Sequence, residues 1–113
     1  MSTAPGAALH YEIEEVKDDQ QGWTVTVVKC HGRLINENTA EIRKAIQPLI
    51  QSGGRIALDF ADLEYMDSSG LGAIVSLKVS AINRGLCVLE LRNLTPRVKK
   101  LLSITNLLQL FSS

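Results

Sequence analysis

Strand-like and helix-like segments alternate along almost the whole sequence. Four segments are rich in β-branched and apolar residues and are predicted to be strands: 9–16, 23–30, 55–60 and 86–91. Apolar residues at helical spacing predict helices in segments 42–50, 71–82 and 96–102, and a last apolar segment covers 107–111. This order predicts an α/β fold with a mostly parallel or mixed central sheet of four to five strands, about four helices and a β-hairpin at the N-terminus.

The first helix has a predicted start and a predicted weak point. Asn38 followed three residues later by Glu41 fits a capping box, although Asn36 competes for the N-cap position. Pro48 lies inside the apolar pattern and lacks a backbone N–H, so we expect it to kink or shorten the last turn. The glycine pair 53–54 is expected to end the helix.

The sequence also predicts which parts of three segments are exposed. The polar residues at 62–67 predict a loop after the third strand. Ser76, Lys78 and Ser80 are expected on the solvent face of the second helix. Segment 86–91 is almost continuously apolar, which is typical of a strand that is covered on both faces.

The chain has 113 residues, which suits one compact domain, and we place this domain at 9–113. Segment 1–8 is small and polar and lacks the features of a signal peptide, so it is expected to be a disordered lead-in. No stretch approaches the roughly 20 apolar residues that span a bilayer. These features predict a cytoplasmic protein that does not interact with membranes, and a monomer in the free state is compatible with them.

Charge and cysteine content argue against two further classes of function. Twelve basic residues balance twelve acidic ones, whereas direct nucleic-acid binding normally needs a basic excess to neutralise phosphates. The basic residues Arg97, Lys99 and Lys100 are interpreted as the solvated face of a helix. Cys30 and Cys87 lie far apart in apolar segments, so we expect buried, reduced thiols and not a disulfide or a metal site.

The most informative motif stands between the third predicted strand and the second predicted helix. It reads Asp67-Ser68-Ser69-Gly70-Leu71-Gly72. Asp67 or Ser68 can cap the helix, but capping does not explain the glycines, each of which costs a helix roughly 1 kcal/mol relative to alanine. We expect one glycine to let the helix approach the sheet closely and the other to let a partner reach the helix N-terminus.

A phosphate on Ser69 would suit this position. Exposed backbone amides and the positive end of the helix dipole would stabilise it, so phosphorylation need not unfold the domain. It would add a charge of about −1.5 to −2, and a partner packed over the serine would then have to desolvate this charge at a cost of several kcal/mol. The alternative on local grounds is an ordinary capped helix.

Other chemistries fit the sequence poorly. A hydrolase would need a base for its serine, but His10 lies near the start of the chain and His31 ends a strand, and neither has an evident acid partner. Asp59, Asp62 and Asp67 lack the spacing of a calcium loop. The glycines form neither a dinucleotide fingerprint nor a P-loop. We therefore predict that the protein is not an enzyme and has no metal and no cofactor.

The segment 66–72, preceded by Leu63, resembles the signature of the STAS domain (sulphate transporter and anti-sigma-factor antagonist). The similarity is closest to the single-domain antagonists. It extends along nearly the whole chain, through a Gly-Arg-Leu turn at Gly32, the strand at 86–91 and the closing segment 101–107. The resemblance implies a STAS-like α/β fold.

The resemblance also implies a function. Ser69 would accept phosphate from a serine kinase that is itself the anti-sigma factor and that holds the ATP. The unphosphorylated antagonist would bind this kinase and free the sigma factor. The phosphorylated antagonist would release the kinase, and a separate phosphoserine phosphatase would remove the phosphate from Ser69. Asp67 would help to place the serine in the kinase, Ser68 would cap or shape the loop, and the motif would contact the partner through residues 67–72.

The sequence departs from the family pattern in the loop before the first helix. Family members often have Gly-Glu-Leu-Asp closely followed by Thr-Ala, whereas segment 32–40 lacks the aspartate and is one residue longer. This loop is expected to lie beside Ser69, so either recognition uses Arg33 or Asn36 or the kinase is an unusual one. Alternative functions on the same fold are a signalling scaffold, a transporter-associated regulatory subunit, and a module that binds a nucleotide or anion.

Overall fold

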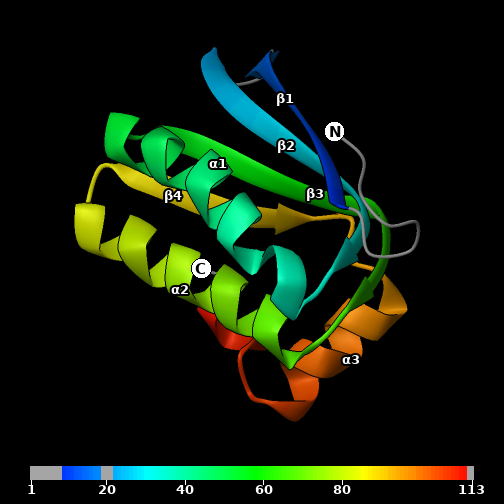
Figure 1. The fold of residues 1–113 in the computed structure, drawn as a ribbon. Helices are drawn as coiled ribbons and strands as arrows, with labels where there is room; N and C mark the ends of the chain where they lie inside the picture. Colours follow the sequence, from blue (N-terminus) through cyan, green and yellow to red (C-terminus); the bar gives the residue numbers. More distant parts are fainter. Residues whose placement is uncertain (1–8, 19–21, 112–113) are drawn as a thin grey trace.

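The computed structural model describes residues 9–18 and 22–111 (Figure 1); the expected lead-in at 1–8 lies outside them. The elements in chain order are β1 Leu9–Asp18, β2 Trp23–Leu34, the 3-10 helix η1 Asn36–Asn38, α1 Thr39–Ser52, β3 Gly54–Met66, α2 Ser68–Arg84, β4 Cys87–Arg92, α3 Pro96–Ile104 and the 3-10 helix η2 Leu108–Phe111. The predicted α/β fold is confirmed. The described part of the chain has four strands and three α-helices, and the last apolar segment forms a short 3-10 helix instead of a fourth α-helix.

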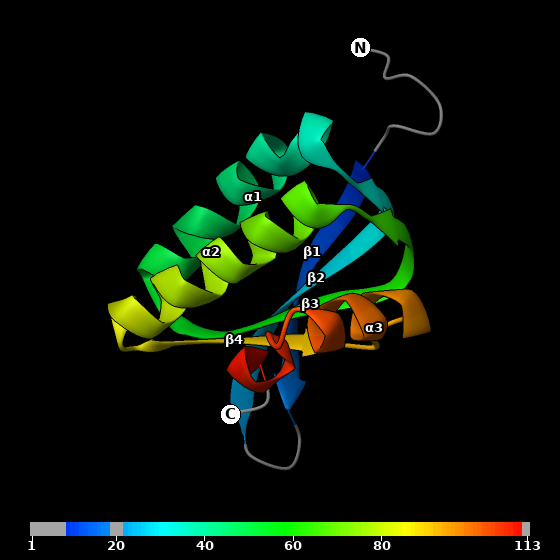
Figure 2. The ribbon, with the colours of Figure 1, turned by 90° about the horizontal axis from the view of Figure 1, so that it is seen from below.

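The strands form one mixed sheet in the order β1-β2-β3-β4. β1 and β2 pair antiparallel, as the predicted hairpin requires, whereas β2, β3 and β4 pair in parallel. Each parallel connection passes through a helix and moves one strand further in the same direction. Because such crossovers are right-handed, α1 and α2 must cover the same face of the sheet, and Figure 2 shows them on that face. We call it the helix face and the opposite one the open face.

The core lies between the helix face and helices α1 and α2. Helix α1 contributes three isoleucines at helical spacing, Ile42, Ile46 and Ile50. The largest fully buried side chains are Phe60, Leu34, Ile42, Ile46, Ile50, Ile56, Leu58, Ile74, Leu77, Leu89, Leu102 and Val28. Burying each of these stabilises the fold by about 1.5–3 kcal/mol, so this packing holds α2, and with it the serine motif, firmly on the sheet.

Strand β3 is longer than predicted. It continues to Met66, so the predicted loop at 62–67 is wrong. Asp62 and Glu64 are exposed, while Leu63 and Met66 are buried. The register between β2 and β3 shifts twice in this stretch, and such bulges break the strict alternation by which a strand is recognised in a sequence.

The prediction that the Asn38 side chain caps helix α1 is also wrong. Asn38 occupies the N-cap position, but its side chain does not cap the helix. Instead, its Oδ1 accepts a hydrogen bond from the Ile35 amide at 3.0 Å and its Nδ2 donates to the Arg33 carbonyl at 2.9 Å, because these backbone groups of the β2–α1 turn need partners. Pro48 does not shorten the helix, which runs on to Ser52.

Lys78 is not on the solvent face of α2, as predicted, but is 5% exposed. Its Nζ donates a hydrogen bond to the carbonyl of Leu89 at 2.7 Å and lies 5.8 Å from the centre of the Phe111 ring. The ammonium therefore keeps an acceptor and an aromatic face while its aliphatic stem is buried. This lysine links α2 to β4 and to the C-terminal 3-10 helix.

Strand β4 is covered on one face only, although the sequence predicts cover on both. Leu89 on the helix face is fully buried, whereas Val88 on the open face is 44% exposed. The adjoining Leu86 is 75% exposed. The reason is topological, since both crossover helices lie on the helix face.

Both cysteines are free and buried, as expected. Burial, with a smaller contribution from the charge of Asp59, raises the pKa of Cys30 to about 12, and burial also raises the pKa of Cys87. Because the thiolate is the reactive form, we expect Cys30 to resist iodoacetamide at neutral pH in the folded protein and to react readily after unfolding. Mass spectrometry of the Cys30 peptide measures this, and fast labelling of the folded protein would contradict it.

Candidate functional site

The serine motif lies at the carboxyl ends of the parallel strands, where β3 ends and α2 begins (Figure 1). Asp67 is the N-cap residue of α2, and Ser68 and Ser69 start its first turn. The Asp67 Oδ1 accepts a hydrogen bond from the Gly70 amide at 2.8 Å. Of the two predicted caps, Asp67 therefore is the one used. This end of an open parallel sheet is where ligands commonly bind.

The Asp67 carboxylate also joins the motif to the loop before α1. Its Oδ2 accepts a hydrogen bond from the Asn36 amide at 3.1 Å, and the Asp67 amide donates to the Leu34 carbonyl at 3.2 Å. One aspartate thus ties together the ends of β2 and β3 and the start of α2. Asn36 lies beside the serine motif, as the sequence predicts.

Ser69 is half-buried and Ser68 is exposed. Within the described part of the chain, the Ser69 hydroxyl has no hydrogen-bond partner. The Leu71 amide makes the first backbone bond of α2, to the Asp67 carbonyl at 3.0 Å, so the amides of Ser68 and Ser69 precede the helical ladder. The hydroxyl is therefore free to react, and a negative group on it would meet the positive end of the helix.

The two glycines of the motif have different surroundings. A Cβ atom on Gly70 would overlap the Leu34 carbonyl oxygen and would lie 3.0 Å from both the Leu34 Cγ and the Met66 Cγ. A Cβ atom on Gly72 would meet nothing within 4 Å. Gly70 is therefore the glycine that lets α2 lie close to the sheet, and Gly72 is exposed on the outside of the first turns.

Arg33 stands opposite Tyr65 at the end of the β2–β3 pair. Its guanidinium lies 5.0 Å from the centre of the Tyr65 ring, and the guanidinium of Arg97 lies 4.6 Å from the same ring. Sequence analysis does not find Tyr65, and it assigns Arg97 to a solvated helix face. Tyr65 comes 32 positions after Arg33 and 32 positions before Arg97 in the chain, so only tertiary packing brings the three residues together.

His31 has acid partners that the sequence does not reveal. Its Nε2 lies 3.3 Å from a Glu12 carboxylate oxygen and its Nδ1 lies 3.2 Å from an Asp62 carboxylate oxygen. Cys30 belongs to the core, so the neighbouring His31 points to the open face. It therefore lies across the sheet from α2 and offers no base to Ser69.

The three aspartates weighed as metal ligands have separate roles. Asp59 accepts hydrogen bonds from the Ala61 amide and the Asn93 side chain, both at 3.0 Å, Asp62 pairs with a histidine, and Asp67 caps α2. Across residues 9–18 and 22–111, no group of acidic, histidine or cysteine side chains is arranged to hold a metal ion. No helix in these ranges is long and apolar enough to cross a membrane.

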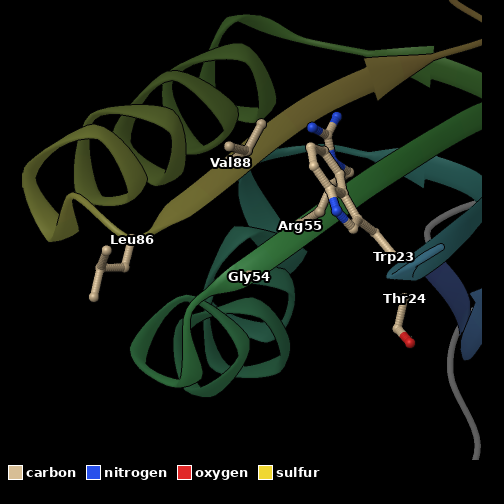
Figure 3. A pocket seen from close by; sticks show the side chains of 6 residues that line it. All are labelled: Trp23, Thr24, Gly54, Arg55, Leu86 and Val88. Atoms are coloured by element: carbon tan, nitrogen blue, oxygen red, sulfur yellow. The ribbon is translucent and has the colours of Figure 1, made fainter. Parts of the chain in front are cut away.

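A surface cavity of about 300 Å³ is shown in Figure 3. It lies where the parallel strands begin, whereas Ser69 lies where they end. It is lined by residues at or next to the starts of three strands: Trp23, Thr24, Gly54, Arg55, Leu86 and Val88. The Arg55 guanidinium lies 4.6 Å from the centre of the Trp23 ring and 3.2 Å from a Glu90 carboxylate oxygen. The guanidinium of Arg55 in this cavity therefore already has an aromatic and an acidic partner within the chain. The serine motif is the better candidate site.

Substitutions of Asp67 should separate its two bonds. Asp67→Asn keeps an oxygen for the Gly70 amide but turns an NH₂ group toward the Asn36 amide, so we expect the free energy of unfolding to fall by about 1 kcal/mol. Asp67→Ala removes both bonds and should cost about 2 kcal/mol. Chemical denaturation measures both, with Glu64→Gln as an exposed acidic control. Equal stability of the three variants would show that the carboxylate does not hold the two loops together.

Comparison with known proteins agrees with this architecture. The family model described as STAS domain matches residues 12–113. The chain is 35% identical over 99 residues to the anti-sigma-B factor antagonist of Bacillus subtilis (strain 168), an alignment that covers 88% of this chain and 84% of the relative.

Two solved structures share the fold. An anti-sigma factor antagonist from Mycobacterium paratuberculosis superimposes with a TM-score of 0.76 at 17% identity, covering 98% of this chain and 88% of that one. The Bacillus cell fate determinant SpoIIAA in the phosphorylated form gives 0.66 at 24% identity, with coverages of 87% and 85%. The match of the family model along residues 12–113 and the 35% identity to the Bacillus subtilis relative show that the chain belongs to the STAS domain family.

Proposed function

We propose that the protein is an anti-sigma-factor antagonist that binds an anti-sigma serine kinase while Ser69 is unphosphorylated and releases it once Ser69 carries a phosphate. The observation that carries the proposal is the unbonded Ser69 hydroxyl in the first turn of α2. Ser69 follows Asp67 by two residues, and the Asp67 carboxylate joins this turn to the Asn36 loop. The name of the Bacillus subtilis relative, an anti-sigma-B factor antagonist, supports the same role.

In this mechanism the protein is a regulatory binding partner and the kinase supplies ATP and the catalytic groups. Asp67 fixes the first turn of α2, which carries the serine, and Asn36 and Arg33 extend the contact surface along the end of β2. The exposed Gly72 leaves room for the kinase next to the serine. A phosphoserine phosphatase then returns the protein to its binding form.

The proposal is tested with the anti-sigma serine kinases encoded in the organism's own genome. Each is incubated with the protein and ATP, and the phosphate is located by mass spectrometry. We expect one kinase to place a single phosphate on Ser69. Ser69→Ala should abolish phosphate uptake. Ser68→Ala should slow the uptake but leave the phosphate on Ser69, and Ser80→Ala, further along α2, should leave the rate of uptake unchanged. Uptake by Ser69→Ala at the wild-type rate, or no uptake from any kinase, would overturn the proposal.

The alternative functions give different results in the same samples. A module that binds a nucleotide or an anion should melt at a higher temperature when GTP, ATP or inorganic phosphate is added without any kinase. A scaffold should stay in its complex after phosphorylation. A transporter-associated subunit should bind a permease and take up no phosphate.

A further inference from the structure

Two arginines from distant elements converge on one aromatic ring. Arg33 is the last residue but one of β2, and Arg97 lies in the first turn of α3. Both guanidinium groups lie over Tyr65 of β3, at 5.0 and 4.6 Å from the ring centre. An aromatic face attracts guanidinium groups and restricts their motion. The ring therefore holds two cations together that would otherwise repel each other.

The positive charge at this place is not neutralised by α3 itself. The sequence of this helix, PRVKKLLSI, contains three basic residues and no acidic one. Arg97, Lys99 and Lys100 are all exposed, and none of them forms an ion pair with any residue that the structure describes. By contrast, Arg55 and Arg92 both pair with Glu90. The three basic side chains of α3 thus have no acidic partner in the described part of the chain, although the whole chain is formally neutral.

This end is also the end that carries Ser69. Tyr65 precedes Asp67 by two residues, and Arg33 precedes Leu34, whose carbonyl accepts the hydrogen bond of the Asp67 amide. Helix α3 lies by the carboxyl-terminal part of β3 in both views (Figures 1 and 2). The basic patch, which we define as Arg33, Tyr65, Arg97, Lys99 and Lys100, therefore lies at the same end of the sheet as the serine motif.

We propose that the basic patch is a docking surface for an acidic segment of the kinase, an inference that rests on the proposed function. Carboxylates fit it because a guanidinium binds a carboxylate through a planar pair of donors, and because the tyrosine ring has already restricted both arginines, so less side-chain entropy is lost on binding. The patch is also coupled to the switch: a phosphate on Ser69 would offset its positive charge and weaken its attraction for the kinase.

The test uses the full chain and a kinase already shown to phosphorylate Ser69. Association rate and Kd of the unphosphorylated protein are measured at low and at high ionic strength, for the wild type, Arg97→Glu, Arg97→Lys and Lys17→Glu. Lys17 is exposed on β1 at the hairpin end of the sheet, so its variant has the same net charge as Arg97→Glu but lies far from Ser69. Thermal unfolding checks that all four are folded.

Arg97→Glu should slow association and raise Kd about tenfold at low ionic strength, and the difference should shrink at high ionic strength. In the phosphorylation reaction it should raise KM and leave kcat unchanged. Arg97→Lys should lose less affinity for the kinase than Arg97→Glu, because it keeps the charge but not the planar donors. The Kd of Lys17→Glu should stay within about twofold of that of the wild type. If the wild type binds no kinase, the proposed function itself falls.

Three results would overturn the docking surface alone while the proposed function stands. Equal effects of Arg97→Glu and Lys17→Glu would mean that only net charge matters. If Arg97→Glu changed the affinity only of the phosphorylated protein, the cations would interact with the phosphate and not with the kinase. Binding of single-stranded RNA that Arg97→Glu abolishes, with kinase affinity unchanged, would assign the patch to nucleic acid.

Discussion

Phosphorylation of Ser69 should weaken binding to the kinase by at least about 100-fold, which corresponds to about 2.7 kcal/mol. The kinase packs over the first turn of α2 in the proposed complex, so a phosphate there brings a charge of about −1.5 to −2 into a contact that formed around a neutral hydroxyl. Desolvating such a charge commonly costs several kcal/mol. The measurement is a titration of the kinase with fully phosphorylated and unphosphorylated protein.

The same phosphate should leave the fold intact. The group would lie near the free amides at the start of α2, where the helix dipole favours a negative charge. We therefore expect the melting temperature of the phosphorylated protein to equal or exceed that of the unphosphorylated one. Ser69→Asp should reproduce part of the loss of affinity, about tenfold, because a carboxylate has less charge and fewer acceptor oxygens than a phosphate. A large fall in melting temperature would mean that phosphorylation acts by unfolding.

Gly70→Ala should destabilise the protein strongly, lowering the free energy of unfolding by about 2–3 kcal/mol. The new Cβ would overlap the Leu34 carbonyl oxygen, which is backbone and cannot rotate aside. Moving this carbonyl would also strain its hydrogen bond with the Asp67 amide. The gain of roughly 1 kcal/mol in helix propensity offsets only part of the cost.

Gly72→Ala is the matched control, because it makes the same chemical change two residues away in open space. It should raise the stability by up to about 1 kcal/mol. Chemical denaturation of the two variants therefore should show shifts of opposite sign. Shifts of the same sign and size would contradict the close approach of α2 to the end of β2. Weaker kinase binding by the more stable Gly72→Ala would show that the kinase contacts this turn.

Much of the fold follows from local patterns in the sequence. The alternation of strands and helices, the N-terminal hairpin and the start of α2 at the serine motif depend on periodicity, turn residues and capping, which are properties of neighbouring residues. The same chemistry predicts Asp67 or Ser68 as the cap of α2, and the structure shows that Asp67 is the one used.

The remaining features depend on contacts that no local pattern contains. The polar residues Asp62 and Glu64 resemble a loop because bulges interrupt the alternation of β3. Lys78 is buried because Leu89, on another element, offers an acceptor. The meeting of Arg33 and Arg97 over one ring depends on how α3 packs against the end of the sheet.

The central claim is tested most directly by following release and phosphorylation in one sample. A complex of the unphosphorylated protein with its kinase is formed without ATP, ATP is then added, and the free protein and the phosphate on Ser69 are measured over time. We predict that release follows phosphate incorporation one for one, and that the Ser69→Ala complex stays together. A complex that persists with Ser69 fully phosphorylated, or a Ser69→Ala complex that separates as fast as the wild type, would contradict the switch.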